Sequence, residues 1–299
     1  MMLKRSIYTH EKQNKRTKRF SSIGESVSKC IAIEDKDTKD INAMWSMVLA
    51  IAIIMLPYRK PHGHIYQCKK NNYVLTIMAD HKFGLPYGSP LRLIFALMID
   101  EIKQTKSPVL CLDKIYLRLL NFFSSTSYAD EPNIENYLYD QMLRLFSSQI
   151  FFINLDKNEE HKFDFWQSRL KGRKKNIFSN SSVSVTKDFF NELMNHPNTV
   201  DFKILKAIRY STIQIDIYIW LVYQFSYLKE LTFISWNTVN DLFGSNYDDL
   251  QDIKNEFMKA LHTIIDLYYE VNVDLEDGGF VLKPNASKNN KNKATEGLI

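Results

Sequence analysis

Apolar positions along this chain recur mainly at helical spacing, and one order of predicted elements occurs twice. In the first occurrence the spacing predicts helices over Leu91–Lys106 and Asp113–Phe123, separated by a short strand over Val109–Leu112. A longer amphipathic helix over Asn133–Ser148 then runs directly into a β-type segment, Gln149–Asn154. Helix, short strand, helix, helix and strand hairpin is the order of a winged-helix domain.

The second occurrence begins with a long apolar helix over Thr212–Tyr227 and a short strand over Thr232–Trp236. Two helices follow, over Asn237–Phe243 and Leu250–Tyr268. The last segment alternates apolar and polar residues on both sides of Asp277-Gly278-Gly279, which is typical of a β-hairpin. The sequence therefore predicts a mainly α chain with small β-hairpins (α+β), built as tandem winged-helix domains.

The remaining segments set the predicted domain boundaries. A helix over residues 41–56 ends at Pro57, and one or two strands are expected between Tyr66 and Met78, of which Tyr73–Met78 is the clearer. Residues 156–182 are too charged to form core, so we interpret them as a long connection. The predicted organisation is a disordered basic arm at residues 1–40, an N-terminal winged-helix domain at 41–182, a C-terminal winged-helix domain at 183–284 and a disordered tail at 285–299.

Composition excludes several classes of protein. Of the 299 residues, 45% are hydrophobic and 13% aromatic, which is enough to form a core and excludes global disorder. The three cysteines are odd in number and far apart, so we expect a reducing, cytoplasmic location and no disulfide framework. The apolar run Met44–Leu56 is shorter than the roughly 20 residues that span a bilayer, so no membrane partner is expected.

Charge is distributed unevenly along the chain, whose net charge is +5. The first twenty residues hold seven basic residues and one acidic residue, and the last thirteen hold three and one. The part between them is net negative, so any nucleic-acid contact by the folded part must depend on local basic patches.

The third helix of a winged-helix domain enters the major groove, and its hairpin contacts the DNA backbone. In the second occurrence an apolar stripe runs from Leu250 to Tyr268 at spacings of three and four. The opposite face presents Asn255, Lys259 and His262, which we predict to contact base edges or phosphates. The alternative is an ordinary solvated helix face. The hairpin adds Lys283 as a further candidate for DNA binding.

The first occurrence supplies two further groups of candidates. On its third helix, Asn136, Arg144 and Ser147 face away from the apolar stripe, and the Arg144 guanidinium could pair with guanine through two hydrogen bonds. A dense basic cluster follows, for which phosphate neutralisation is the functional interpretation and a solvated loop is the alternative. The cluster consists of Arg169, Lys171, Arg173, Lys174 and Lys175.

One short pattern in the sequence could indicate a metal site. His62-Gly63-His64 has the spacing of the metal pair in rolling-circle initiators, but a glycine after a proline turn occupies the middle position, and the sequence offers no third ligand. A phosphate-binding glycine loop and a nucleophile elbow are likewise absent from the sequence. We therefore predict no catalytic residue, metal or cofactor, and a protein that is not an enzyme.

A set of short motifs is distributed between Leu56 and Gly279. They are Leu56–Pro61, Leu85–Leu93, Thr105–Ser107, Gln141–Phe146, Phe189-Phe190, Asp216–Tyr223, Ile234–Trp236, Leu242–Gly244 and Asp277–Gly279. These motifs resemble those of the plasmid-encoded RepA replication proteins. The resemblance implies a replication initiator that binds repeated double-stranded DNA sequences at a plasmid origin, helps to open it and recruits host replication proteins for helicase loading. It also allows a homodimer. A winged-helix transcription regulator and a rolling-circle nicking endonuclease remain as alternatives.

Overall fold

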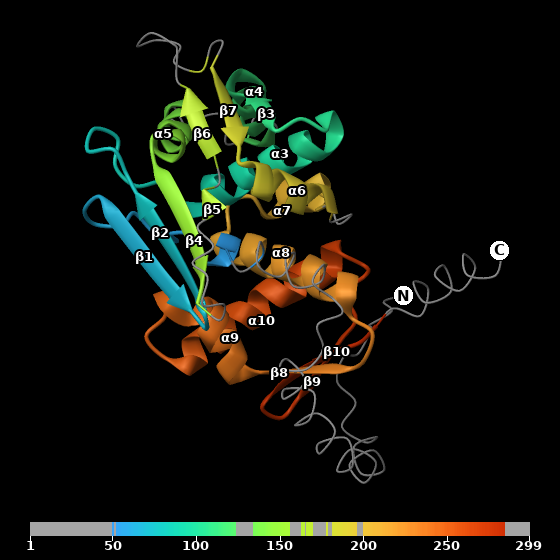
Figure 1. The fold of residues 1–299 in the computed structure, drawn as a ribbon. Coiled ribbons are helices and arrows are strands. Elements are labelled where there is room, and N and C mark those ends of the chain that lie inside the picture. The colour runs from blue at the N-terminus through green and yellow to red at the C-terminus, as the bar shows by residue number, and fades with distance from the viewer. Residues whose placement is uncertain are drawn as a thin grey trace, which may run out of the picture. The chain divides into compact units, whose positions relative to one another are not determined.

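The computed structural model is mainly helical, with short antiparallel strands in three sheets among the residues that it describes (Figure 1). These residues all belong to one compact unit, residues 42–299. The predicted α+β class is therefore confirmed. In the described part of the chain, no helix combines the length and the apolar character that a bilayer crossing requires. The described residues are 50, 52–123, 134–155, 163–164, 166–169, 178, 181–195 and 200–284.

The first half contains the predicted helix, strand, helix and helix. Helix α3 (Gly88–Thr105) is followed by β3 (Val109–Cys111), α4 (Leu112–Phe123) and α5 (Ile134–Phe146). Helix α3 ends at Lys106, whose left-handed backbone directs its amide to the carbonyl of Ile102 at 2.8 Å. Apolar residues on all three helices are buried, as their spacing predicted.

A four-stranded sheet precedes and follows these helices in sequence. The segment predicted as one or two strands forms a hairpin of β1 (Ile65–Lys70) and β2 (Tyr73–Met78), and β4 (Gln149–Asn154) pairs with β2. The order is β1-β2-β4-β5, where β5 is Phe163–Asp164. Alternate residues of β2 point into the core, because successive side chains of a strand face opposite sides.

The prediction that Gln149–Asn154 opens the hairpin of the first winged helix is wrong. Strand β3 pairs instead with β7 (Ser182–Val185), and β7 pairs with β6 (Trp166–Arg169), in the order β3-β7-β6. Strand β6 lies in the segment interpreted as a connection, and β7 begins at the last residue of that segment, Ser182. Strand β7 has only four residues, of which Val183 and Val185 are buried. The predicted domain boundary between residues 182 and 183 falls inside β7.

Two short helices without a sequence-based prediction follow β7. They are α6 (Lys187–Asn195) and α7 (Phe202–Ile208). The Asp201 carboxylate begins α7 by accepting the amide of Lys203 at 2.7 Å. Helix α7 then contributes buried apolar residues to the core beside α8.

The second half follows its prediction closely. Strand β10 (Gly279–Leu282) pairs with both β8 (Thr232–Ser235) and β9 (Val273–Glu276), so the order β8-β10-β9 has the same form as β3-β7-β6. The side chains of Ser211, Ser235 and Asp249 each accept an amide of the first turn of the helix that follows. The elements are α8 (Thr212–Tyr227), β8 (Thr232–Ser235), α9 (Trp236–Phe243), the 3-10 turn η4 (Gly244–Asn246), α10 (Leu250–Leu267), β9 (Val273–Glu276) and β10 (Gly279–Leu282).

The hairpin motif requires its two glycines for different reasons. Gly278 has a φ of 87°, in the left-handed region that glycine adopts without steric cost. A Cβ on Gly279 would lie 2.1 Å from the carbonyl oxygen of Ile234 on the neighbouring strand. The close approach of β10 to β8 therefore excludes a side chain at residue 279.

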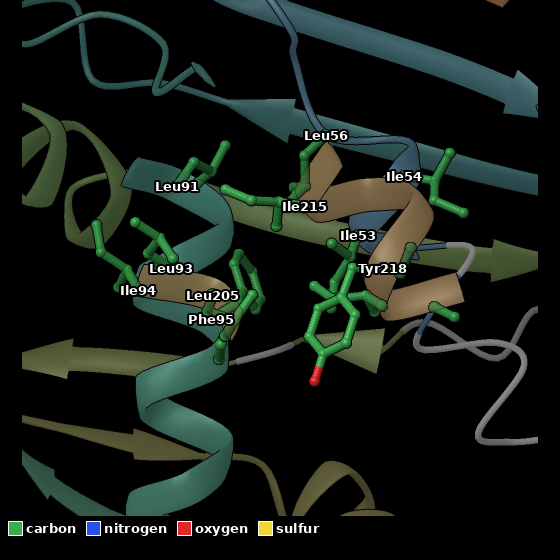
Figure 2. Close-up of a cluster of buried hydrophobic side chains, with 14 of the residues drawn as sticks. Ile53, Ile54, Leu56, Leu91, Leu93, Ile94, Phe95, Leu205, Ile215 and Tyr218 are labelled. Atoms are coloured by element: carbon green, nitrogen blue, oxygen red, sulfur yellow. The ribbon is translucent and has the colours of Figure 1, made fainter. Parts of the chain in front are cut away.

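One hydrophobic core joins elements of both halves. Figure 2 shows side chains from Ile53–Leu56, α3, α7 and α8 converging in this cluster. A fully buried ion pair lies at the same junction: the Arg92 Nε of α3 donates to Asp216 Oδ1 of α8 at 2.9 Å. The remaining guanidinium hydrogens donate to Asp216 Oδ2 and to the carbonyls of Leu56, Pro57 and Gly88 at 2.8–3.3 Å. Arg92 thus joins three of the RepA-like motifs, Leu56–Pro61, Leu85–Leu93 and Asp216–Tyr223.

Candidate nucleic-acid interface

Helix α10 is attached to the protein by a continuous apolar face. Ile253, Phe257, Leu261 and Ile264 are buried, as the predicted stripe requires, whereas Leu250 at the start of the helix is exposed. Phe257 is at the centre of an aromatic cluster, with ring centroids 5.4–6.2 Å from those of the neighbouring rings. This packing fixes the direction in which the other face of α10 points. The partners of Phe257 in the cluster are Trp236, Phe243 and Phe280.

The opposite face of α10 is open, and all three predicted residues lie on it. Asn255, Lys259 and His262 are exposed, and the Lys259 side chain is 73% accessible. Lys259 Nζ reaches Glu256 Oε1 at 2.7 Å, and Asn255 Oδ1 accepts a hydrogen bond from Gln251 at 2.9 Å. These exposed interactions are easily exchanged for contacts with a ligand.

The electrostatic character of this helix is acidic. From Asp248 to Asp266 the chain carries five carboxylates and only two lysines, Lys254 and Lys259. Lys254 lies over the Trp236 ring at 5.0 Å from its centroid, which leaves Lys259 as the cation of the open face. Helix α10 offers hydrogen-bonding groups for base edges, but it supplies little positive charge for phosphates.

The hairpin candidate Lys283 follows β10. Its ammonium group pairs with Asp274 of β9, and its amide donates to the carbonyl of Asn272 at 2.9 Å. The side chain therefore links the two strands of the hairpin and is only partly exposed.

The corresponding helix of the first half, α5, is in a different environment. The prediction that Arg144 extends from an open face is wrong, because its side chain is only 15% accessible. Arg144 Nε donates to Asp140 at 2.5 Å, Nη1 reaches the Leu85 carbonyl at 3.4 Å, and the guanidinium lies over Tyr87. The segment before α3 therefore covers this side of α5.

Other residues in and after α5 are also buried to different degrees. Gln141 is fully buried and accepts the backbone amide of Tyr87 at 2.9 Å. Ser147 is half-buried, whereas Asn136 in the first turn is exposed. Of the three candidates on α5, Asn136 alone is freely accessible.

The predicted basic cluster starts at the end of a strand. Arg169 is the last residue of β6 and is paired in register with Ser182 of β7. Lys171, Arg173, Lys174 and Lys175 lie outside the described residues, in the segment that connects these two strands. The basic arm and the C-terminal tail also lie outside the described residues.

The His-x-His motif is exposed at the start of β1. The His64 ring contacts that of His81, with centroids 4.2 Å apart. Among the described residues, no three His, Cys, Asp or Glu side chains are grouped in a way that could hold a metal ion. Two basic residues near this motif, Arg59 and Lys60, are also exposed. Sequence reasoning missed them, because neither belongs to a helix face or to a dense basic run.

Comparisons with known proteins give a matching family and solved structures with a similar fold. A model of the family described as "Plasmid encoded RepA protein" matches residues 112–238, from α4 into α9. A crystal structure of RctB domains 2–3 and one of a selenomethionine derivative of domain 2 and domain 3 of RctB share the fold. For each, the TM-score is 0.50 at 12% identity, covering 80% of this chain and 98% of that chain. No curated protein matches the sequence.

The matched residues 112–238 span parts of both halves of the fold and include Asp216 of the buried ion pair. The motifs noted in the sequence extend beyond it on both sides, to Leu56 and to Gly279. Over residues 112–238 the chain therefore matches the family of plasmid encoded RepA proteins, as its sequence motifs predicted.

Proposed function

We propose that this chain initiates plasmid replication by binding repeated double-stranded DNA sequences at the plasmid origin. The family match supports the role in plasmid replication. The observation that carries the DNA-binding proposal is the open polar face of α10 on a helix whose other face is fixed in the core. The order α8, β8, α9, α10 and the β9–β10 hairpin supports a winged-helix domain in which α10 enters the major groove.

Within this proposal the two halves have unequal roles. Asn255, Lys259 and His262 on α10 contact base edges or phosphates, whereas the Arg144 side of α5 is covered by the segment before α3. The first half contributes through the β6–β7 hairpin, whose connecting segment carries the basic cluster. Lysine and arginine there neutralise phosphates and add affinity without reading sequence. A second sheet of the form β3-β7-β6 supports a second winged helix.

The proposal includes the steps that follow DNA binding. An initiator bound to adjacent repeats helps to open the origin and recruits host replication proteins that load the helicase. The resemblance to RepA proteins also allows a homodimer, in which one of the two halves provides the contact between copies. We further propose that the protein acts in the cytoplasm by binding alone and is not an enzyme.

A binding experiment tests this function. Labelled duplexes that carry the repeats flanking the gene are titrated with purified full-length protein, in parallel with scrambled duplexes, by fluorescence anisotropy. Binding to the repeats is expected to be about 10³-fold tighter or more at physiological salt. Equal affinities for both duplexes would contradict the proposal, and binding confined to promoter sequences would favour a transcription regulator.

The same protein preparation separates binding from nicking. Supercoiled origin plasmid incubated with the protein and Mg²⁺ or Mn²⁺ is expected to remain supercoiled, because no described side-chain group has the arrangement of a metal site. Open circles together with a covalent protein–DNA adduct would establish a nicking enzyme instead.

A further inference from the structure

A second group of basic side chains lies at the open end of the β1–β2 hairpin. The segment before β1 and the segment after β2 meet there, since the amide of Ala79 donates to the carbonyl of His64 at 2.8 Å. Ile65 and Met78 pair directly beyond this bond, and both are exposed. Six exposed basic or imidazole side chains lie on these two segments, and the rings of His64 and His81 are in contact across them, with centroids 4.2 Å apart. We call these six residues the hairpin-base patch. They are Arg59, Lys60, His62, His64, His81 and Lys82.

The backbone of the patch is held by the fold rather than by the basic groups themselves. Tyr58, directly before Arg59, shares a hydrogen bond with Tyr247, and the Arg92 guanidinium lies 5.8 Å from the centroid of its ring. On the other segment, the Asp80 carboxylate accepts the amide of Lys82 at 2.7 Å. The cationic groups of Arg59 and Lys60 therefore extend from an anchored segment into solvent.

Charge makes this patch suited to a polyanion. It holds three permanent cations, Arg59, Lys60 and Lys82, against one carboxylate, Asp80. The imidazoles add hydrogen-bond donors that phosphate oxygens accept. Helix α10 has no such excess of positive charge, because carboxylates outnumber lysines along it.

Tyr247 connects the patch to the open face of α10. Burial and the nearby Glu256 raise the pKa of Tyr247, whereas its hydrogen bond to Tyr58 and the nearby Arg59 lower it. Lys259 is also within electrostatic range of Tyr247. Arg59 and the Glu256–Lys259 turn of α10 are therefore both within electrostatic range of the Tyr247 side chain.

We propose that the hairpin-base patch is a phosphate-binding surface for double-stranded DNA that is read by α10. The proposal rests on the proposed function. It supplies the positive charge for DNA phosphates that α10 lacks. In this arrangement a segment of the first half neutralises the DNA backbone beside a groove that the second half reads. The contacts carry no sequence information, so they affect all duplexes alike.

The test measures the affinity and its dependence on salt for repeat-containing and random duplexes. The variant Arg59→Ala/Lys60→Ala/Lys82→Ala is compared with Lys187→Ala/Lys203→Ala/Lys206→Ala on α6 and α7, which removes the same charge elsewhere. The patch variant is expected to lose on the order of tenfold in affinity for both duplexes. Its slope of log affinity against log salt should fall by about 2 to 3, because each lost phosphate contact contributes about 0.9.

Outcomes of this experiment separate the two proposals. Equal losses in the patch and control variants would overturn the patch as a specific surface, because net charge alone would then explain them. An unchanged salt slope in the patch variant would also overturn it. If the wild-type protein shows no preference for repeats, sequence recognition fails, while the slope on random duplexes still tests the patch. Matching melting temperatures show that the variants are folded.

Discussion

Replacing Arg92 by leucine is expected to lower the free energy of unfolding by about 3–5 kcal/mol, because it leaves Asp216 as an unpaired charge in the core. Both side chains are almost fully buried, so water cannot replace the missing partner. The carbonyls of Leu56 and Pro57 also lose the guanidinium hydrogens that they accept at 2.8 Å. The effect should appear as a lower midpoint in urea unfolding.

The pH dependence of this loss follows from the carboxyl group. Burial raises the pKa of Asp216, while the charge and hydrogen bonds of Arg92 lower it. Without Arg92 the pKa rises further, so folding of the variant is favoured by proton uptake. The deficit relative to wild type should therefore shrink as the pH falls from 8 towards 5.

A double variant provides the control for the ion pair. Arg92→Leu/Asp216→Leu removes both charges and is expected to be more stable than Arg92→Leu alone, because the uncompensated charge is gone. A single variant as stable as wild type at pH 8, or a deficit that grows as the pH falls, would contradict the assigned role of this pair.

Replacing Phe257 by alanine should cost about 3–5 kcal/mol, because it leaves a cavity beneath α10. The side chain is completely buried, and its ring stacks on Phe280 of β10 at a centroid distance of 5.4 Å. Aromatic pairs of this kind add about 0.5–1.5 kcal/mol to the burial of their area. DNA affinity should fall together with stability, because Phe257 fixes the orientation of α10.

Calorimetry and DNA binding measure this second prediction together. Phe257→Leu is the matched variant, because it keeps an apolar side chain in the site and should lose less stability. If Phe257→Ala melted at the wild-type temperature, the proposed attachment of α10 to β10 would be wrong.

Local patterns predicted much of the fold, and the reasons are visible in particular elements. Helix α8 has the predicted bounds, Thr212–Tyr227, and it begins at the Ser211 cap. The β9–β10 turn was predicted from Asp277-Gly278-Gly279, because Gly278 adopts the positive φ that this pattern favours. The partner of β3 could not be predicted in this way. Pairing between β3 and β7 joins residues more than seventy positions apart, and sequence periodicity holds no information about such a choice.

The candidate site was likewise predicted only where local periodicity determines it. Helical periodicity correctly placed Asn255, Lys259 and His262 on an open face, because one apolar stripe determines both faces of a helix. It misplaced Arg144, because the segment that covers α5 comes from residues 84–87, more than fifty positions away. The hairpin-base patch joins residues 59–64 with residues 81–82 and becomes visible only when β1 and β2 pair.

The most direct test of the account is a base-substitution scan across one origin repeat, measured with wild type, Asn255→Ala/Lys259→Ala and Arg144→Ala. The α10 variant is expected to lose about 1–3 kcal/mol of discrimination between the correct and the substituted base at a few base pairs. Its melting temperature should stay the same, because both residues are exposed. Arg144→Ala should leave the base preference unchanged and lower the melting temperature, because its guanidinium bonds within the fold. An unchanged base preference in the α10 variant, or a changed one in Arg144→Ala, would contradict the assignment of α10 as the helix that reads DNA.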